Sequence, residues 1–170
     1  MVPRPIAWVS TRSPEGVDNV APHSYFNAVS SDPLHVSFVS SGVKDTLTNV
    51  RATGEFVVNL VSMDVVEEMN ATATDLPADV DEFDWFGLER TPAHAVDAPR
   101  VAIAPAHLEC RVAHELPVGN AFLVVGEVVH VHVDPSIWRD GRVDAVAYAP
   151  VARLAGRQYA PLGPVFELPR

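Results

Sequence analysis

The sequence predicts a mostly β protein with a few short helices, arranged as an antiparallel barrel or sandwich. Its 9 glycines and 15 prolines divide the 170 residues into short segments, and the apolar runs between them are rich in valine. Short strands bounded by turn residues are typical of antiparallel barrels and sandwiches rather than of doubly wound sheets. The length suits a single domain over residues 1–170 with its own hydrophobic core.

Strands account for most of the predicted fold. We expect them at residues 6–11, 20–26, 34–40, 55–61, 106–116, 121–133 and 151–154. In the third, the apolar residues Leu34, Val36 and Phe38 alternate with polar ones and should share one face. Residues 117–120 have the composition of a hairpin turn, and Gly126 inside a long strand suggests a bulge.

Two helices and one helical turn are predicted between the strands. The first helix covers residues 45–52, with Asp45 as its N-cap and Gly54 in the position that ends it. The second begins at Asp64, where the sequence has a capping-box pattern. The acidic and aromatic segment 75–88 is interpreted as a surface loop that carries one helical turn.

Charge and composition exclude several classes of function. The formal net charge of −10 argues against nucleic-acid binding, which depends on Lys and Arg neutralising phosphates. No run approaches the roughly 18 apolar residues of a membrane span, and the N-terminus does not resemble a secretion signal. The single cysteine, Cys110, cannot form an internal disulfide, which is typical of a cytoplasmic protein.

Residues 40–46 are the segment best suited to bind a phosphate group. They leave a predicted strand, turn at a glycine and enter a predicted helix, and they contain the only lysine of the chain, Lys44. A helix N-terminus presents free backbone N–H groups and partial positive charge to an anion. The segment does not match the nucleotide-triphosphate loop, and a simple capped turn is the alternative interpretation.

Motifs that follow one another in order along the chain are RPIAWVST (4–11), NVAPHSYFNAVSS (19–31), KDT (44–46) with Asn49, GEFVVNL (54–60), EEMNAT (67–72), LEC (108–110), GEV (126–128) and RLAGRQY (153–159). Together these segments resemble the flavin reductase-like, FMN-binding split-barrel family. The first 62 residues carry the strongest part of the resemblance, which extends over nearly the whole chain.

This resemblance implies an FMN pocket in an open antiparallel barrel of Greek-key type, completed by a second subunit of a homodimer. The residues that it assigns to the phosphate are Ser40, Ser41, Lys44 and Thr46. Those assigned to the edge of the isoalloxazine ring are Asn27, Ala28 and Val29. Candidates for the pocket walls are Trp8, Ser10, Asn70 and Tyr159. Core packing is the alternative for Trp8, a turn for Asn27, and core or dimer packing for Tyr159.

The function implied by the resemblance is an NAD(P)H-dependent flavin reductase that passes electrons onward, for example to a partner oxygenase or redox protein. No catalytic acid or base is required, because hydride passes directly to the flavin ring. The sequence has no GxGxxG dinucleotide motif, so NADH or NADPH would stack on the exposed flavin. An FMN-binding electron carrier without nicotinamide activity is the second hypothesis.

A metal-binding barrel is the third hypothesis. His130 and His132 lie at i and i+2 on a predicted strand and therefore point to the same side. No further histidine and carboxylate follow at a convincing spacing, so we expect no metal and interpret the pair as a polar strand face. Cys110 is interpreted as a packed thiol without a redox role.

Overall fold

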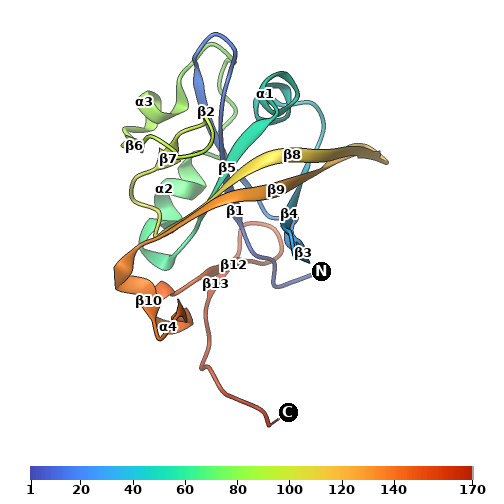
Figure 1. The fold of residues 1–170 in the computed structure, drawn as a ribbon. Coiled ribbons are helices and arrows are strands. Elements are labelled where there is room, and N and C mark those ends of the chain that lie inside the picture. Colours follow the sequence, from blue (N-terminus) through green and yellow to red (C-terminus); the bar gives the residue numbers. More distant parts are fainter. Residues whose placement is uncertain (170) are drawn as a thin grey trace.

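The computed structural model, which describes residues 1–169, is built around one seven-stranded antiparallel sheet (Figure 1). The strand order is β2-β1-β5-β8-β9-β4-β3. The strands are β1 (Ala7–Arg12), β2 (Asp18–His23), β3 (Phe26–Ser31), β4 (Leu34–Ser40), β5 (Glu55–Leu60), β8 (Ala106–Val118) and β9 (Ala121–Val133). The predicted class, mostly β with short helices, is confirmed.

The corner between β2 and β3 closes the sheet into a barrel. These strands follow each other in the chain but lie at opposite edges of the sheet. Only Ser24 and Tyr25 separate them, a distance of at most about 10 Å, so the two edges must approach each other here. The Val39 N–H of β4 donates to the Tyr25 carbonyl at 2.9 Å. The expected single strand at 20–26 is therefore wrong, because this corner divides it.

Helix α1 (Asp45–Thr53) covers one end of the barrel and supplies part of its core. Leu47 and Val50 on its buried face belong to the same apolar cluster as Phe38 and Phe56 of the sheet. The helix ends at Gly54, whose left-handed φ of 72° suits a glycine. Asp45 is not the N-cap, which is a correction: the extended residue Lys44 holds that position.

The segment after β5 packs a second core cluster against the outer face of β1 and β2. It contains η1 (Met63–Val65), α2 (Val66–Ala71) and α3 (Glu82–Phe86), and the cluster includes Trp8, Met69 and Phe83. The helix expected to begin at Asp64 instead starts as a 3-10 turn. No side chain of the described chain caps that turn or α2, so the capping box is wrong. The segment 75–88 was expected to be a surface loop, but it is partly packed into the core, because Phe83 is buried.

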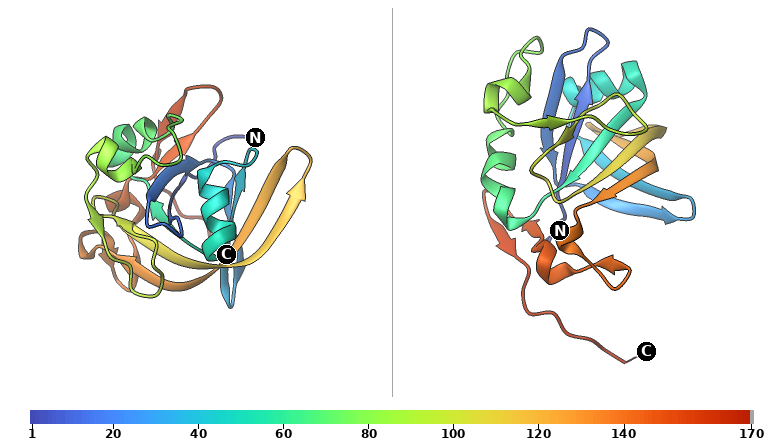
Figure 2. Two further views of the ribbon diagram at one scale, coloured as in Figure 1. Left: turned by 90° about the horizontal axis from the view of Figure 1, so that it is seen from above. Right: turned by 60° about the vertical axis from the view of Figure 1, so that its left-hand side comes forward.

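The β8–β9 hairpin is the longest feature of the sheet, and it curves around the molecule (Figure 2). Its register shifts between Glu109 and Cys110 and between Val112 and His114. Gly126 pairs with Val112 directly beside the second shift, so a bulge lies next to this glycine, but its extra residue, Ala113, belongs to β8. A Cβ at Gly126 would lie 2.4 Å from Phe56 Cζ, so the close approach of this ring explains the glycine.

Short elements complete the chain. They are β6 (Arg90–Thr91), β7 (Arg100–Val101), η2 (Pro135–Ile137), β10 (Trp138–Arg139), β11 (Arg142–Val143), α4 (Ala145–Tyr148), β12 (Val151–Arg153) and β13 (Tyr159–Pro161). The strand expected at 151–154 is β12, and β13 pairs with it. Residues 162–169 then extend away from the body (Figure 1). Among residues 1–169, no helix has the length and apolar character needed to cross a membrane.

Candidate functional site

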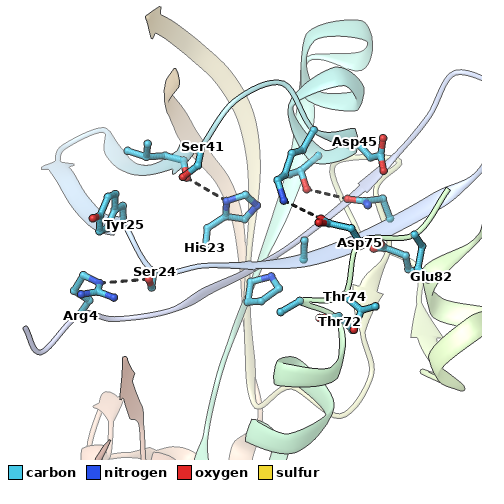
Figure 3. A pocket seen from close by; sticks show the side chains of 18 residues that line it. Arg4, His23, Ser24, Tyr25, Ser41, Asp45, Thr72, Thr74, Asp75 and Glu82 are labelled. Carbon is cyan, nitrogen blue, oxygen red and sulfur yellow. Dashed lines mark hydrogen bonds and ion pairs between the residues drawn. The ribbon is translucent and has the colours of Figure 1, made fainter. Parts of the chain in front are cut away.

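A cavity of about 400 Å³ lies where the β2–β3 corner, the start of α1 and the segment after α2 meet (Figure 3). Its volume is within the range of roughly 300–1,000 Å³ that is usual for small-molecule sites. The lining residues are Arg4, Asn19, Ala21, Pro22, His23, Ser24, Tyr25, Val39, Ser41, Lys44, Asp45, Thr46, Thr72, Ala73, Thr74, Asp75, Leu76 and Glu82. Three of the residues predicted to hold a phosphate, Ser41, Lys44 and Thr46, are thus brought together.

The N-terminus of α1 forms one wall of the cavity. Lys44 is the N-cap residue, and no side chain among residues 1–169 caps the helix. The first backbone N–H groups and the positive end of the helix dipole are therefore free to face an anion. Thr46 is buried in the first turn, where its Oγ1 donates to Asn19 Oδ1 at 3.0 Å. This wall combines an ammonium group, hydroxyl groups and helix N–H groups.

Lys44 makes an ion pair across the cavity. Its Nζ lies 2.8 Å from Asp75 Oδ1, and Asp75 belongs to the segment that follows α2 (Figure 3). The hydrogen bond from Lys44, together with its charge, lowers the pKa of the Asp75 carboxyl. The ammonium that could bind a phosphate is thus already in contact with a carboxylate of the chain.

His23 lies in the cavity wall with one nitrogen unpaired. Its Nδ1 is 3.2 Å from the Val39 carbonyl oxygen, which can only accept, so we assign the proton of the neutral ring to Nδ1. The buried Nε2 is then an acceptor, and it has no hydrogen-bond partner within residues 1–169. Burial lowers the pKa of His23 to about 4, so the ring is neutral at pH 7.

Glu82 of α3 contributes a buried carboxyl group to the wall of the cavity. The Val20 N–H donates to its Oε2 at 2.5 Å. Burial raises the pKa of Glu82 to about 7, and the nearby carboxylates Asp45, Asp81 and Asp75 add to the shift. The position of α3 is fixed by Arg90, whose guanidinium lies 3.0 Å from Asp81, the N-cap of that helix.

The corner residues give the cavity an aromatic rim. Arg4 Nε donates to Ser24 Oγ at 3.3 Å, and Arg4 Cζ lies 5.4 Å from the centre of the Tyr25 ring (Figure 3). Tyr25 is 62% exposed, so one aromatic surface remains available for a planar ligand. Arg4 also donates to the Leu154 carbonyl at 3.0 Å, which connects this rim to the region after β12.

The predicted residues Trp8, Ser10 and Ser40 are buried and do not line the cavity. Trp8 is fully buried, and its Nε1 donates to Oγ1 of the lining residue Thr72 at 2.9 Å. Ser10 Oγ donates to the Pro99 carbonyl at 2.5 Å, and Ser40 Oγ donates to the Gly42 carbonyl at 2.9 Å. Trp8 is thus a core residue that supports the wall.

The remaining candidates lie in two other places. Asn27, Ala28 and Val29 are exposed on the edge strand β3, where Asn27 Oδ1 accepts from the Ala28 N–H at 2.9 Å. Asn70 and Tyr159 contact each other, because the Tyr159 hydroxyl donates to Asn70 Oδ1 at 2.7 Å. The fold joins this second pair across 89 residues of sequence. None of the five lines the cavity.

Sequence reasoning missed several lining residues. His23, Ser24 and Tyr25 lie inside the NVAPHSYFNAVSS segment, so the resemblance already pointed to them. For Glu82 the sequence showed only that an acidic residue lies beside aromatic ones, which does not distinguish a lining residue from a surface residue. For Asp75 we find no local signal, because its role depends on a contact with a residue 31 positions away.

His130, His132 and Cys110 lie outside this cavity. The ring centres of His130 and His94 are 4.5 Å apart, and those of His132 and His107 are 5.4 Å apart. Across residues 1–169, no three His, Cys, Asp or Glu side chains are arranged to hold a metal ion. Cys110 is buried in the barrel core, where burial raises the pKa of its thiol, as expected for a packed residue.

Comparison with known proteins identifies the family. The model of the flavin reductase like domain matches residues 1–147. The chain belongs to the flavin reductase-like family. Its sequence is 37% identical to that of an uncharacterised protein of Halalkalibacterium halodurans, over all of this chain and 87% of the relative.

Solved structures of the family agree with this fold. Nitrilotriacetate monooxygenase component B from Bacillus cereus is 36% identical, with a TM-score of 0.95 over 99% of this chain and 88% of that one. The 2-nitrobenzoate 2-nitroreductase NbaA from Pseudomonas fluorescens is 30% identical, with a TM-score of 0.92 over 99% and 85%. More distant neighbours confirm the split-barrel architecture that the resemblance implied.

Two features of the cavity residues fit a flavin ligand. Lys44, Ser41 and the N-terminus of α1 supply cationic and neutral donors for an anionic group. The unpaired Nε2 of His23 supplies an acceptor that a hydroxyl or N–H of a ligand could satisfy. The carboxylates Asp45 and Asp75 oppose the first of these features, because like charge repels a phosphate.

Proposed function

We propose that this protein is an NAD(P)H-dependent flavin reductase that binds FMN in the cavity between α1 and the β2–β3 corner. The observation that carries the proposal is the position of Lys44. The only lysine of the chain lies at the uncapped N-terminus of α1, beside Ser41 and Thr46, in a domain of the flavin reductase-like family. Because the protein has a net charge of −10, a phosphate needs local positive charge and N–H donors, and this group of residues supplies both.

The chain itself would bind and orient the flavin. Lys44, Ser41 and Thr46 would hold the phosphate, while Asn27, Ala28 and Val29 of β3 stay candidates for the ring edge. FMN would supply the redox chemistry, by accepting a hydride and passing electrons onward. Among the described residues, Glu82 is the lining carboxyl with a pKa near neutrality, but direct hydride transfer requires no protein acid or base.

NADH or NADPH is the proposed hydride donor, and an oxygenase is the proposed class of acceptor. Support for an oxygenase comes from the similarity to component B of a monooxygenase. The chain carries no dinucleotide motif, so the nicotinamide would be recognised where it stacks on the flavin, near the exposed ring of Tyr25. Its affinity should therefore be weak, with a KM toward ~0.1–1 mM.

We further propose that the working unit is a homodimer. Apolar side chains are exposed on the edge strand β3 (Val29), at the tip of the β8–β9 hairpin (Leu116 and Val118) and in the C-terminal segment (Phe166). Burial of such side chains against a second copy would stabilise a symmetric dimer. Light scattering of the flavin-loaded protein at micromolar concentration should give twice the mass of one chain, and the mass of a single chain would refute the dimer.

An anaerobic reduction experiment tests the proposed function. Purified protein loaded with FMN is mixed with NADH or NADPH, and the flavin absorbance near about 450 nm is followed. We expect bleaching within seconds with no other protein present. If dithionite bleaches the flavin and neither nicotinamide does, the protein is an electron carrier instead. If the protein binds no flavin at all, the proposal fails.

A further inference from the structure

The ammonium group of Lys44, which we propose binds the flavin phosphate, is paired with a carboxylate of the chain, that of Asp75. Lys44 Nζ and Asp75 Oδ1 are 2.8 Å apart, and their side chains are 55% and 86% exposed. Lys44 stands at the start of α1 and Asp75 follows α2, so the pair connects two sides of the cavity (Figure 3). An anion that approaches Lys44 therefore meets a negative group already in place.

The Lys44–Asp75 ion pair is weak enough for a phosphate to compete with Asp75 for the ammonium group. Ion pairs between exposed side chains contribute little to stability, since water and salt screen them. A phosphate that carries up to two negative charges can therefore displace the carboxylate from Lys44. The displaced Asp75 then stays near the phosphate and repels it, and Asp45 adds to the negative charge on the same side of the cavity.

We propose that Asp75 is an internal competitor for the phosphate of the flavin and thereby weakens the binding of FMN. This inference rests on the proposed function, because it assumes that the phosphate binds at Lys44. It adds a residue that weakens binding of the phosphorylated ligand only. Riboflavin, which has no phosphate, does not compete with Asp75 for the ammonium group.

Flavin titration of an isosteric variant tests this role. FMN and riboflavin affinities are measured at low salt for the wild type, Asp75→Asn and the control Asp79→Asn. Asp79 is exposed on the same segment but does not line the cavity, so its replacement removes an equal charge four residues away. We expect Asp75→Asn to tighten FMN binding about three- to tenfold and to leave riboflavin within about twofold. Asp79→Asn should change both affinities by less than about twofold.

The same variants in a Lys44→Ala background show whether Asp75 acts through the lysine. The gain in FMN affinity from Asp75→Asn should be clearly smaller there, because no ammonium group is left to release. An equal gain in both backgrounds overturns the inference, as does a wild type that binds FMN while Asp75→Asn binds it no more tightly. Equal tightening of FMN and riboflavin also overturns it. Failure of all the proteins to bind either flavin would instead remove the proposed function together with this inference.

Discussion

The indole Nε1 of Trp8 donates a hydrogen bond to Thr72 Oγ1 at 2.9 Å, and through it a fully buried core residue holds a wall of the candidate flavin cavity. Thr72 in turn donates to the Met69 carbonyl at 2.8 Å. The end of α2 is therefore fixed to the sheet by a polar contact inside an apolar cluster, where such bonds are costly to lose.

Replacement of Trp8 by phenylalanine should weaken this wall. We expect a loss of about 1–3 kcal/mol in the free energy of unfolding, because Thr72 loses its donor and the smaller ring leaves unfilled space in the core. FMN and riboflavin should both bind about two- to fivefold more weakly, since the change lies away from the phosphate end. Urea unfolding and flavin titration measure the two effects. Trp85→Phe is the control, because Trp85 is 63% exposed, and equal effects of the two variants would contradict the assignment.

Replacement of Lys44 by alanine should separate the two flavins. A charge-assisted contact to phosphate contributes roughly 1.5–3 kcal/mol, so FMN affinity should fall about 10- to 150-fold. Riboflavin affinity should hardly change, and Lys44→Arg should retain much of the FMN affinity. Fluorescence titration with both ligands checks this prediction, and equal losses for both would mean that Lys44 has a structural role.

A methyl group at Gly126 should destabilise the barrel. Its Cβ would lie 2.4 Å from Phe56 Cζ, and overpacking of this kind costs about 1–3 kcal/mol. Thermal unfolding of Gly126→Ala should show a Tm lower by several degrees. The double variant with Phe56→Leu should be less destabilised than the sum of the two single variants, because the shorter side chain relieves the contact. Simple additivity would show that the ring does not limit this position.

Acid should destabilise the protein through His107. Burial lowers the pKa of His107 to about 4 in the folded chain, against an ordinary value of 6.5, so the unfolded state takes up a proton first as pH falls. Its contribution to stability is complete above pH 6.5 and is lost as pH falls toward 4. The buried His23 acts in the same direction. Glu82, whose pKa is raised, acts in the opposite direction: its contribution is present at low pH and is lost as pH rises through about 7.

The variant His107→Gln tests this dependence, since glutamine can still donate to the Val101 carbonyl but does not titrate. Urea unfolding between pH 4 and 7 should show a flatter pH profile for His107→Gln than for the wild type. The exposed His114→Gln should retain the wild-type slope. An unchanged slope in His107→Gln would mean that other groups cause the acid sensitivity.

His130 and His132 should both be replaceable by glutamine without loss of flavin. They lie on β9 outside the cavity, and each stacks on another histidine, so we expect a stability change within about 1 kcal/mol. Flavin absorbance and metal analysis of the purified proteins check this. Stoichiometric zinc or iron in the wild type that is lost in the double variant would favour the metal-binding hypothesis.

Local sequence patterns were sufficient for the fold class and for most elements. The alternation of Leu34, Val36 and Phe38 predicted β4 with its correct bounds, and Gly54 marked the end of α1. The grouping of Ser41, Lys44 and Thr46 at one site was also predicted, and all three line the cavity, because they are close in sequence and their arrangement depends only on a strand-to-helix turn. Period and turn chemistry are local properties, so a single sequence reveals them.

Tertiary structure decided the features that depend on distant contacts. Only the closure of the barrel divides residues 20–26 and brings His23 and Tyr25 to the cavity that the start of α1 also lines. The contact between Lys44 and Asp75 and the burial of Glu82 depend on how the segment after β5 packs on β1 and β2. No local periodicity encodes such contacts, because they arise when apolar faces far apart in the chain are buried together and bring their polar neighbours with them.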